Sequence, residues 1–448
     1  MALPALDRLD RLDRLDRLDA VGVDGAGAGA PDGDRPEAAP TPAGALRPAT
    51  RLTLRPLSVV PQGEEFLVGD PEAGTFLALP AVGLVAVRAL QAGGTIAEAS
   101  DAAAAHAGQE VDVLDFAATL VECGLVAAID GQALAPAGAP RGRSWLAGLS
   151  PALAGPFFSA PAWTLYGLAF VACAAVFVAR PQLWPRYEDA FFYPDPAVSL
   201  VTMTVVTTLL TAGHELCHWL AARAAGVGAR FGVSRRLFFP VFETDLSQLW
   251  SVPRGRRYGA FLAGMAFDTL VLAASLGLRL LWATGHVDLP PLLGRLLGAV
   301  VLVQVFGLGW QALVFLRTDL YAVLITALGC FNLSRVTTLW LKGKLRRLPR
   351  AEAAELRTAH PRDAQVVRWF AWLYLVGLLG LLYVFVNYFL PGTVVVAGWM
   401  FGSLRGAPPG SAAFWQALTI GSVAAAQAVL PLAIFVWQRH QERRGAIP

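Results

Sequence analysis

The chain has 448 residues, of which 55% are hydrophobic and only 15% are charged, and its mean hydropathy is +0.52. Soluble globular chains carry about a quarter charged residues, so this composition favours a membrane protein. The net charge of +3 does not point to a nucleic-acid partner. The four cysteines have no paired spacing, so we expect no disulfide framework.

Residues 1–50 are predicted to form a low-complexity, disordered tail. The opening "LDRLDRLDRLDRLDA" repeats every three residues, which gives a helix no sustained apolar face. The following stretch is rich in Ala, Gly, Pro and Asp, a composition that cannot bury enough apolar surface to fold. No continuous apolar run is present here, so the segment does not have the pattern of a signal peptide.

Residues 51–135 are predicted to form a small winged-helix-like α+β domain. In "EEFLVGDPEAGTFLALP", two apolar runs flank the turn residues 70–74, as is typical of a β-hairpin. Helical patterns follow in "VGLVAVRALQAGG", "TIAEASDAAAA" and "DVLDFAATLVECG", and the second begins with the capping-box pair Thr95 and Glu98. "LVAAID" is then typical of a strand, which gives the order hairpin, three helices, strand.

This arrangement resembles the PqqD-like domains that bind precursor peptides for modification. The resemblance covers about eighty residues and is carried by "TFLALPAVGLVAVRALQAGGTIAEAS" and "FAATLVECGLVAAIDG". A small domain of another role remains the alternative interpretation. The resemblance implies that this domain presents a peptide.

The rest of the chain is predicted to be a polytopic transmembrane domain, residues 161–437, between an interfacial linker at 136–160 and a cytoplasmic tail at 438–448. Each apolar segment is near or above the twenty residues that cross a bilayer. The fourth is too long for one straight crossing, so we expect a break near Asp319. The six predicted spans are 161–179, 197–222, 257–283, 292–325, 368–390 and 412–437.

Lys and Arg are distributed unevenly among the loops, which predicts the orientation of the chain. Segments 223–256 and 326–367 carry six and eight of them, whereas 180–196, 284–291 and 391–411 carry two, none and one. Because positive loops stay on the cytoplasmic side, six spans with both termini cytoplasmic fit this alternation. The predicted location is the plasma membrane, and the predicted fold class is mainly α.

The segment "TVVTTLLTAGHELCHWLAARAAG" places His214, Glu215 and His218 inside the second predicted span. Imidazoles at i and i+4 lie on one face of a helix and can bind one Zn²⁺, while Glu215 can take a proton from water beside the metal. Ionisable side chains within a span need a compensating partner, and a metal ion is one. The alternative is that the three face a polar crevice and pair with one another.

Catalytic zinc takes three protein ligands, so a third is expected from another span. Asp268 and Asp319 are the candidates, and their estimated depths do not decide between them. Asp319 is a metal ligand or, alternatively, a cap or arginine partner at a span end. Asp268 can hydrogen-bond a ligating imidazole or pair with Arg279 or backbone groups, and a structural role is the favoured reading.

The HExxH motif, followed about a hundred residues later by an aspartate in another span, resembles the site-2 protease family of intramembrane zinc metalloproteases. The similarity covers residues 196–340 and is greatest to the bacterial putative peptide zinc metalloprotease branch. It implies that His214, His218 and Asp319 bind zinc and that Glu215 is the general base.

The chain departs from the family pattern at three positions. Leu320 follows the aspartate where the family commonly has Gly, and Leu313 stands where many members have the Asn of an Asn-Pro pair. Cys217 replaces a frequent Gly, and is read as a small packing side chain or an additional thiolate ligand.

The sequence therefore predicts one of two functions. The first is a membrane-embedded zinc metalloprotease that hydrolyses a peptide bond in or near the bilayer, with a ribosomally made peptide as a candidate substrate. The second is a non-catalytic zinc-binding accessory protein for peptide maturation or export. The expected partners are a peptide or membrane-protein substrate, the lipid bilayer, and an exporter or precursor peptide.

Overall fold

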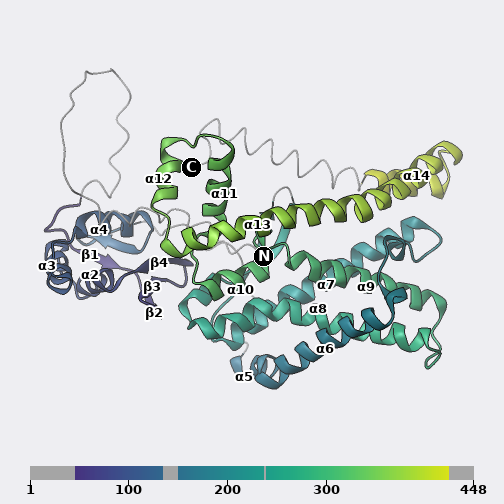
Figure 1. Cartoon of the computed structure of the whole chain (residues 1–448), viewed down its shortest axis with the longest axis horizontal. Helices are drawn as coiled ribbons and strands as arrows, with labels where there is room; N and C mark the ends of the chain where they lie inside the picture. Colours follow the sequence, from purple (N-terminus) through teal and green to yellow (C-terminus); the bar gives the residue numbers. More distant parts are fainter. Residues whose placement is uncertain (1–45, 135–149, 237–238, 423–448) are drawn as a thin grey trace, which may run out of the picture.

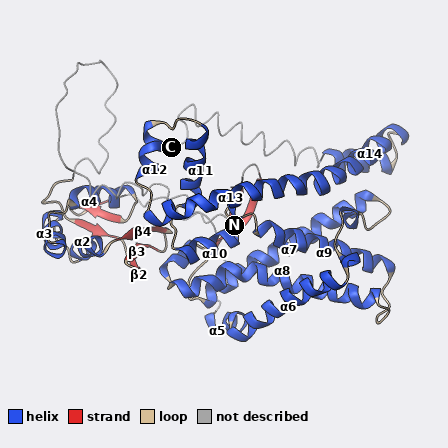
Figure 2. Ribbon diagram, in the orientation of Figure 1, coloured by secondary structure: helices blue, strands red, loops and turns tan. Residues whose placement is uncertain are grey.

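The computed structural model describes residues 46–134, 150–236 and 239–422. The predicted mainly α class is confirmed, because helices make up 70% and strands 9% of the structure (Figure 2). A small N-terminal module containing sheet lies at one end of a body of long helices (Figure 1). The predicted tail at 1–50 and C-terminal tail at 438–448 lie almost wholly outside the described residues.

The N-terminal module contains the predicted hairpin, three helices and strand in that order. The hairpin pairs Asp70 with Thr75 across the predicted turn, where Gly74 has φ +66. Thr95 and Glu98 form both hydrogen bonds of the capping box. The elements are β1 (Leu52–Leu54), β2 (Ser58–Gln62), β3 (Glu65–Asp70), β4 (Thr75–Leu79), α2 (Ala81–Gln91), α3 (Ile96–Ala107), α4 (Val113–Glu122), β5 (Val126–Ile129) and β6 (Gln132–Ala133).

Three of these strands, β1, β2 and β6, were absent from the sequence prediction. They complete two antiparallel three-stranded sheets, ordered β2-β3-β4 and β1-β5-β6. All three are short. The sequences of β1 and β6 do not differ from those of loops, and both strands are defined by their pairing with β5.

Strands β3 and β4 of the β2-β3-β4 sheet are buried on both faces. Leu67 and Phe76 belong to the same buried cluster as Trp219 and Trp250 of the helical body, whereas the adjacent Val68 and Leu77 face the helices of the module. Because successive side chains of a strand point to opposite faces, burial on both sides requires continuous apolar runs rather than alternation. Figure 1 shows this sheet between the module's helices and the body, so the module is docked through a shared core.

The helical body is built around α8 (Arg254–Ala283), which packs against α6 (Ala160–Ala179), α7 (Pro196–Ala224), α9 (Pro291–Gln311) and α10 (Asp319–Leu328). The first three predicted spans correspond to α6, α7 and α8, each long and apolar enough to cross a membrane. Large apolar side chains of α6 are exposed, which is the surface expected of a lipid-facing helix.

The fourth predicted span breaks before Asp319, as expected. Helix α9 ends at Gln311, a 3₁₀ turn η7 (Val314–Leu316) follows, and Arg317 adopts the left-handed conformation with φ 59. Helix α10 then begins, and it meets α11 (Leu333–Leu345) at an angle of 90°. Among the described residues, five helices could each span a membrane, or six if this bent pair counts as one span.

The predicted loop at 391–411 is wrong, because the helix of the fifth span continues through it. Helix α13 (Pro361–Val384) leads through a π turn (Phe385–Phe389) into α14 (Leu390–Gly406), an unbroken stretch of 46 residues. Pro391 lies within this continuous helix, and the wider π turn just before it relieves the steric conflict that a proline ring causes in an α-helix. Residues 412–422 of the sixth predicted span are helical, and 423–437 lie outside the described residues.

The segments expected to be loops also contain regular structure. Segment 223–256 holds a two-stranded hairpin, β7 (Arg230–Arg236) and β8 (Phe239–Asp245), followed by a 3₁₀ helix η6 (Ser247–Ser251). Segment 326–367 holds α11 and α12 (Arg350–Arg357). In the predicted linker, α5 (Pro151–Ala154) and a 3₁₀ turn η3 (Gly155–Phe158) precede α6.

The two faces of β4 give a test of the docked arrangement. Phe76→Ala should cost about 3–5 kcal/mol at the interface with the body, and Leu77→Ala about 2–5 kcal/mol within the module, because each leaves a cavity in a different core. Hydrogen-exchange mass spectrometry should show faster exchange in η6 for the first variant and in α2 for the second. Identical exchange patterns in the two variants would contradict a sheet shared between two cores.

Candidate metal centre

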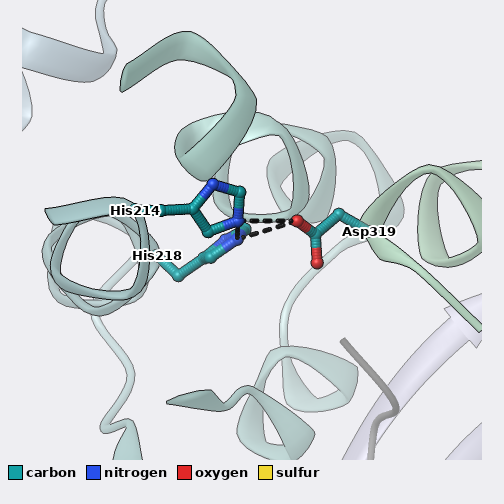
Figure 3. A group of neighbouring side chains, drawn as sticks. All are labelled: His214, His218 and Asp319. Atoms are coloured by element: carbon teal, nitrogen blue, oxygen red, sulfur yellow. Dashed lines mark hydrogen bonds and ion pairs between the residues drawn. The ribbon is translucent and has the colours of Figure 1, made fainter. Parts of the chain in front are cut away.

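Three metal-competent side chains from two separate helical segments converge inside the body (Figure 3). The Nε2 atoms of His214 and His218 lie 3.1 Å apart. One oxygen of Asp319, Oδ2, lies 3.1 Å from the His214 nitrogen and 3.0 Å from that of His218. His218 and Asp319 are fully buried, and His214 is nearly so.

The local structure explains why the three meet. His214 and His218 lie one turn apart on the same face of α7. Asp319 is the first residue of α10, directly after the break, and its backbone N–H donates to the Gln311 side chain at 3.0 Å. The Thr318 hydroxyl donates to the Gln311 carbonyl at 2.7 Å. The end of α9 therefore fixes the start of α10 and with it the Asp319 carboxylate.

The second nitrogen of each imidazole has an acceptor. Nδ1 of His214 lies 2.8 Å from Oδ2 of Asp268, and Nδ1 of His218 lies 2.7 Å from the Ala260 carbonyl oxygen. A carboxylate and a carbonyl oxygen can only accept, so these partners assign the proton to Nδ1 in both neutral rings. Both Nε2 lone pairs then point into the space that Asp319 faces.

This donor set fits a metal ion. Two lone pairs and a carboxylate oxygen at 3.0–3.1 Å repel one another unless a positive charge lies between them. Tetrahedral zinc with bonds of 2.0–2.1 Å would hold its ligand atoms about 3.3 Å apart, close to the observed spacing. Two imidazole nitrogens with one carboxylate oxygen leave a coordination position open, as catalytic zinc sites do.

One face of α8 supports both histidines. Three of its residues, each one turn from the next, line this face. Ala260 contacts His218, whereas Gly264 and Asp268 both contact His214. A Cβ at Gly264 would lie 2.3 Å from His214 Nε2, so the ring rests directly on the glycine backbone. Ala260 and Gly264 were not predicted to belong to the site, although small residues four apart in an apolar helix indicate close helix packing.

Of the partners considered for Asp268, the structure shows the imidazole of His214. Arg279 pairs instead with Asp189 at 3.3 Å. Cys217 packs against the buried apolar cluster and is not part of the metal-competent group found in the described residues. Leu320, beside Asp319, packs against the same cluster.

Glu215, the predicted general base, is held by the β7–β8 hairpin. Its Oε2 accepts the Thr244 backbone N–H at 2.7 Å, and its backbone carbonyl accepts the Thr244 hydroxyl at 3.0 Å. Both residues are buried. Thr244 was not among the predicted site residues, because segment 223–256 was expected to be a loop.

Comparison with known proteins yields no relative: no family model, curated protein or solved structure matches the chain. The properties of the site therefore follow from its geometry and from the residues themselves.

The contact between Gly264 and His214 gives a direct test of the site. Gly264→Ala should displace the imidazole and weaken zinc binding at least about tenfold, which corresponds to 1.4 kcal/mol. Gly277→Ala is the matched control, since it lies on the same helix with nothing within 4 Å of its added Cβ. Zinc affinity would be measured in detergent by competition with a chelator, and equal affinities for the two variants would contradict the described packing.

The Asp268 hydrogen bond gives a second test. Asp268→Asn should lower zinc affinity about 10–100-fold, because the amide no longer holds His214 in the Nδ1–H form as a basic ligand. Asp189→Asn also removes a partly buried carboxylate from the bundle, but its partner is Arg279, so zinc affinity should be unchanged. If the Asp189 variant lost zinc equally, the effect of Asp268→Asn would be one of general stability.

Proposed function

We propose that the chain is a membrane-embedded zinc metalloprotease of the site-2 protease type. The observation that carries the proposal is the convergence of two imidazole lone pairs and the Asp319 carboxylate, from α7 and α10, with Glu215 adjacent to His214 in the chain. Five described helices are long and apolar enough to cross a membrane, which supports an intramembrane site. The donor set of two nitrogens and one oxygen is typical of catalytic zinc.

When bound, zinc supplies Lewis acidity that polarises a peptide carbonyl and lowers the pKa of water. The chain's own residues perform the proton transfers. Glu215 accepts a proton from the water whose oxygen attacks the carbonyl carbon, and it returns that proton to the amine nitrogen as the C–N bond breaks. The Thr244 N–H holds Oε2 of Glu215 and thereby fixes where the carboxylate points during both transfers.

The proposed orientation places both termini in the cytoplasm. The basic segments 223–256 and 326–367 support this orientation. The N-terminal module would then lie on the cytoplasmic side, and its proposed role, by its likeness to PqqD-like domains, is to present a peptide.

A second function, a zinc-binding accessory protein without turnover, is favoured by a specific observation. Glu215 is buried, and its Oε2 already accepts the Thr244 backbone N–H, the kind of contact made by a carboxylate with a structural role. Leu313 and Leu320 also depart from the family pattern. Such a protein would keep zinc and its biological role without cleaving peptides.

Glu215→Gln separates the two functions. The wild type should purify in detergent with one zinc, His214→Ala should lose it, and Glu215→Gln should retain it. When the proteins are reconstituted with a library of synthetic transmembrane peptides, mass spectrometry should show new peptide termini only with the wild type, with a loss of at least about a hundredfold in the Gln variant. Equal cleavage by wild type and Glu215→Gln would rule out the general-base role, and a wild type without zinc would refute both functions.

A further inference from the structure

The β3–β4 turn of the N-terminal module touches the base of the β7–β8 hairpin at two points. The Arg230 side chain, at the start of β7, donates to the Glu72 carbonyl at 3.0 Å. Gly74 lies so close to Ser247, two residues past β8, that an added Cβ would be 2.5 Å from the Ser247 hydroxyl oxygen. Arg230 and Asp245 are paired in register, so the turn contacts both ends of the open side of the hairpin.

A buried arginine holds the adjoining segments together. The Arg257 guanidinium is fully buried and donates to the carbonyl oxygens of Val252 at 2.9 Å and Trp250 at 3.3 Å, and to the Gln62 side chain of β2 at 3.0 Å. It also lies 4.7 Å from the centre of the Trp250 ring. Because a desolvated cation is costly unless its donors are satisfied, these contacts fix β2, η6 and the start of α8 relative to one another.

Only a short stretch of chain separates this interface from Glu215. Ser247 begins η6, and its N–H donates to the Asp245 carboxylate at 2.9 Å, which makes a tight turn out of β8. Thr244, which directly precedes Asp245, makes the two hydrogen bonds to Glu215. The position of Ser247 therefore determines where the Thr244 N–H lies.

We propose that the N-terminal module is a positioning element of the catalytic site: the β3–β4 turn, through Ser247 and Arg230, sets the Thr244 amide that orients Glu215. The module then does more than bind a peptide, because the site is complete only when the module is docked. The catalytic consequence rests on the proposed function, whereas the structural link between Gly74 and the Thr244 amide does not.

Two glycines of the same sheet provide a matched experiment. Gly74 and Gly63 both lie in hairpin turns at positive φ, +66 and +71, so alanine strains either turn. Only Gly74 contacts Ser247, since an added Cβ at Gly63 meets nothing within 4 Å. Gly74→Ala should accelerate exchange of the Thr244 amide at least tenfold in the full chain, and Gly63→Ala should leave it at the wild-type rate.

The exchange of this amide would be read by hydrogen-exchange mass spectrometry with fragmentation to single residues, and Glu215→Ala would give the rate without its acceptor. Wild-type exchange in Gly74→Ala would overturn the proposal. Equal acceleration in Gly63→Ala would also overturn it, because turn strain alone would then explain the effect.

Arg230→Ala tests the second contact without altering the module, which keeps the proposal falsifiable if Gly74→Ala does not fold. It should accelerate Thr244 exchange severalfold at unchanged zinc content, and unchanged exchange would count against the proposal. If the chain cleaves peptides, both variants should lower kcat with little change in KM. Faster exchange in a chain that never cleaves peptides would refute the protease function and leave the positioning role in place.

Discussion

The structure depends on one electrostatic constraint: two imidazole lone pairs and a carboxylate oxygen share a space about 3 Å across inside an apolar bundle. Without a positive charge among them, the three groups repel one another where water cannot screen the repulsion. The surrounding helices hold the groups in place despite that cost. Helix α9 stops at Gln311, and its side chain then fixes the first residue of α10. The break in this apolar segment is thus a requirement of the site.

Helix α8 provides the complementary support. One face of this helix contacts the histidines of α7 at three points, each one turn from the next. The contacts are made by the Ala260 carbonyl oxygen, the Gly264 backbone and the Asp268 carboxylate. Close approach of α7 and α8 is possible because Gly213 on α7 faces the Phe267 ring while Gly264 on α8 faces His214. The two helices therefore supply small residues reciprocally, and the rings are oriented by packing as much as by hydrogen bonds.

The features that were predicted correctly from the sequence are those that depend only on neighbouring residues in the chain. The turn at residues 70–74, the Thr95 capping box and the one-turn spacing of His214 and His218 need no distant partner, and all are present. The contact between Asp268 and His214 could not be derived, because two helices of about thirty residues can meet at many depths. The continuation of the fifth span through 391–406 was not predicted, because no local pattern shows that a π turn precedes Pro391 and accommodates it. The β7–β8 hairpin was missed because part of what holds it, the Glu215 carboxylate and the module's turn, lies elsewhere in the chain.

The environment of Glu215 shows why a docked module suits this site. The Thr244 N–H holds one oxygen of this buried carboxylate, so the position of the amide determines which way the carboxylate points. A β7–β8 hairpin without further contacts would orient the Glu215 carboxylate imprecisely, because a two-stranded hairpin alone is marginally stable. Contacts from the β3–β4 turn and the buried Arg257 give the base of that hairpin a fixed support. Strands β3 and β4, which are buried on both faces, join the module to the helix that carries Glu215 through a core that the two parts share.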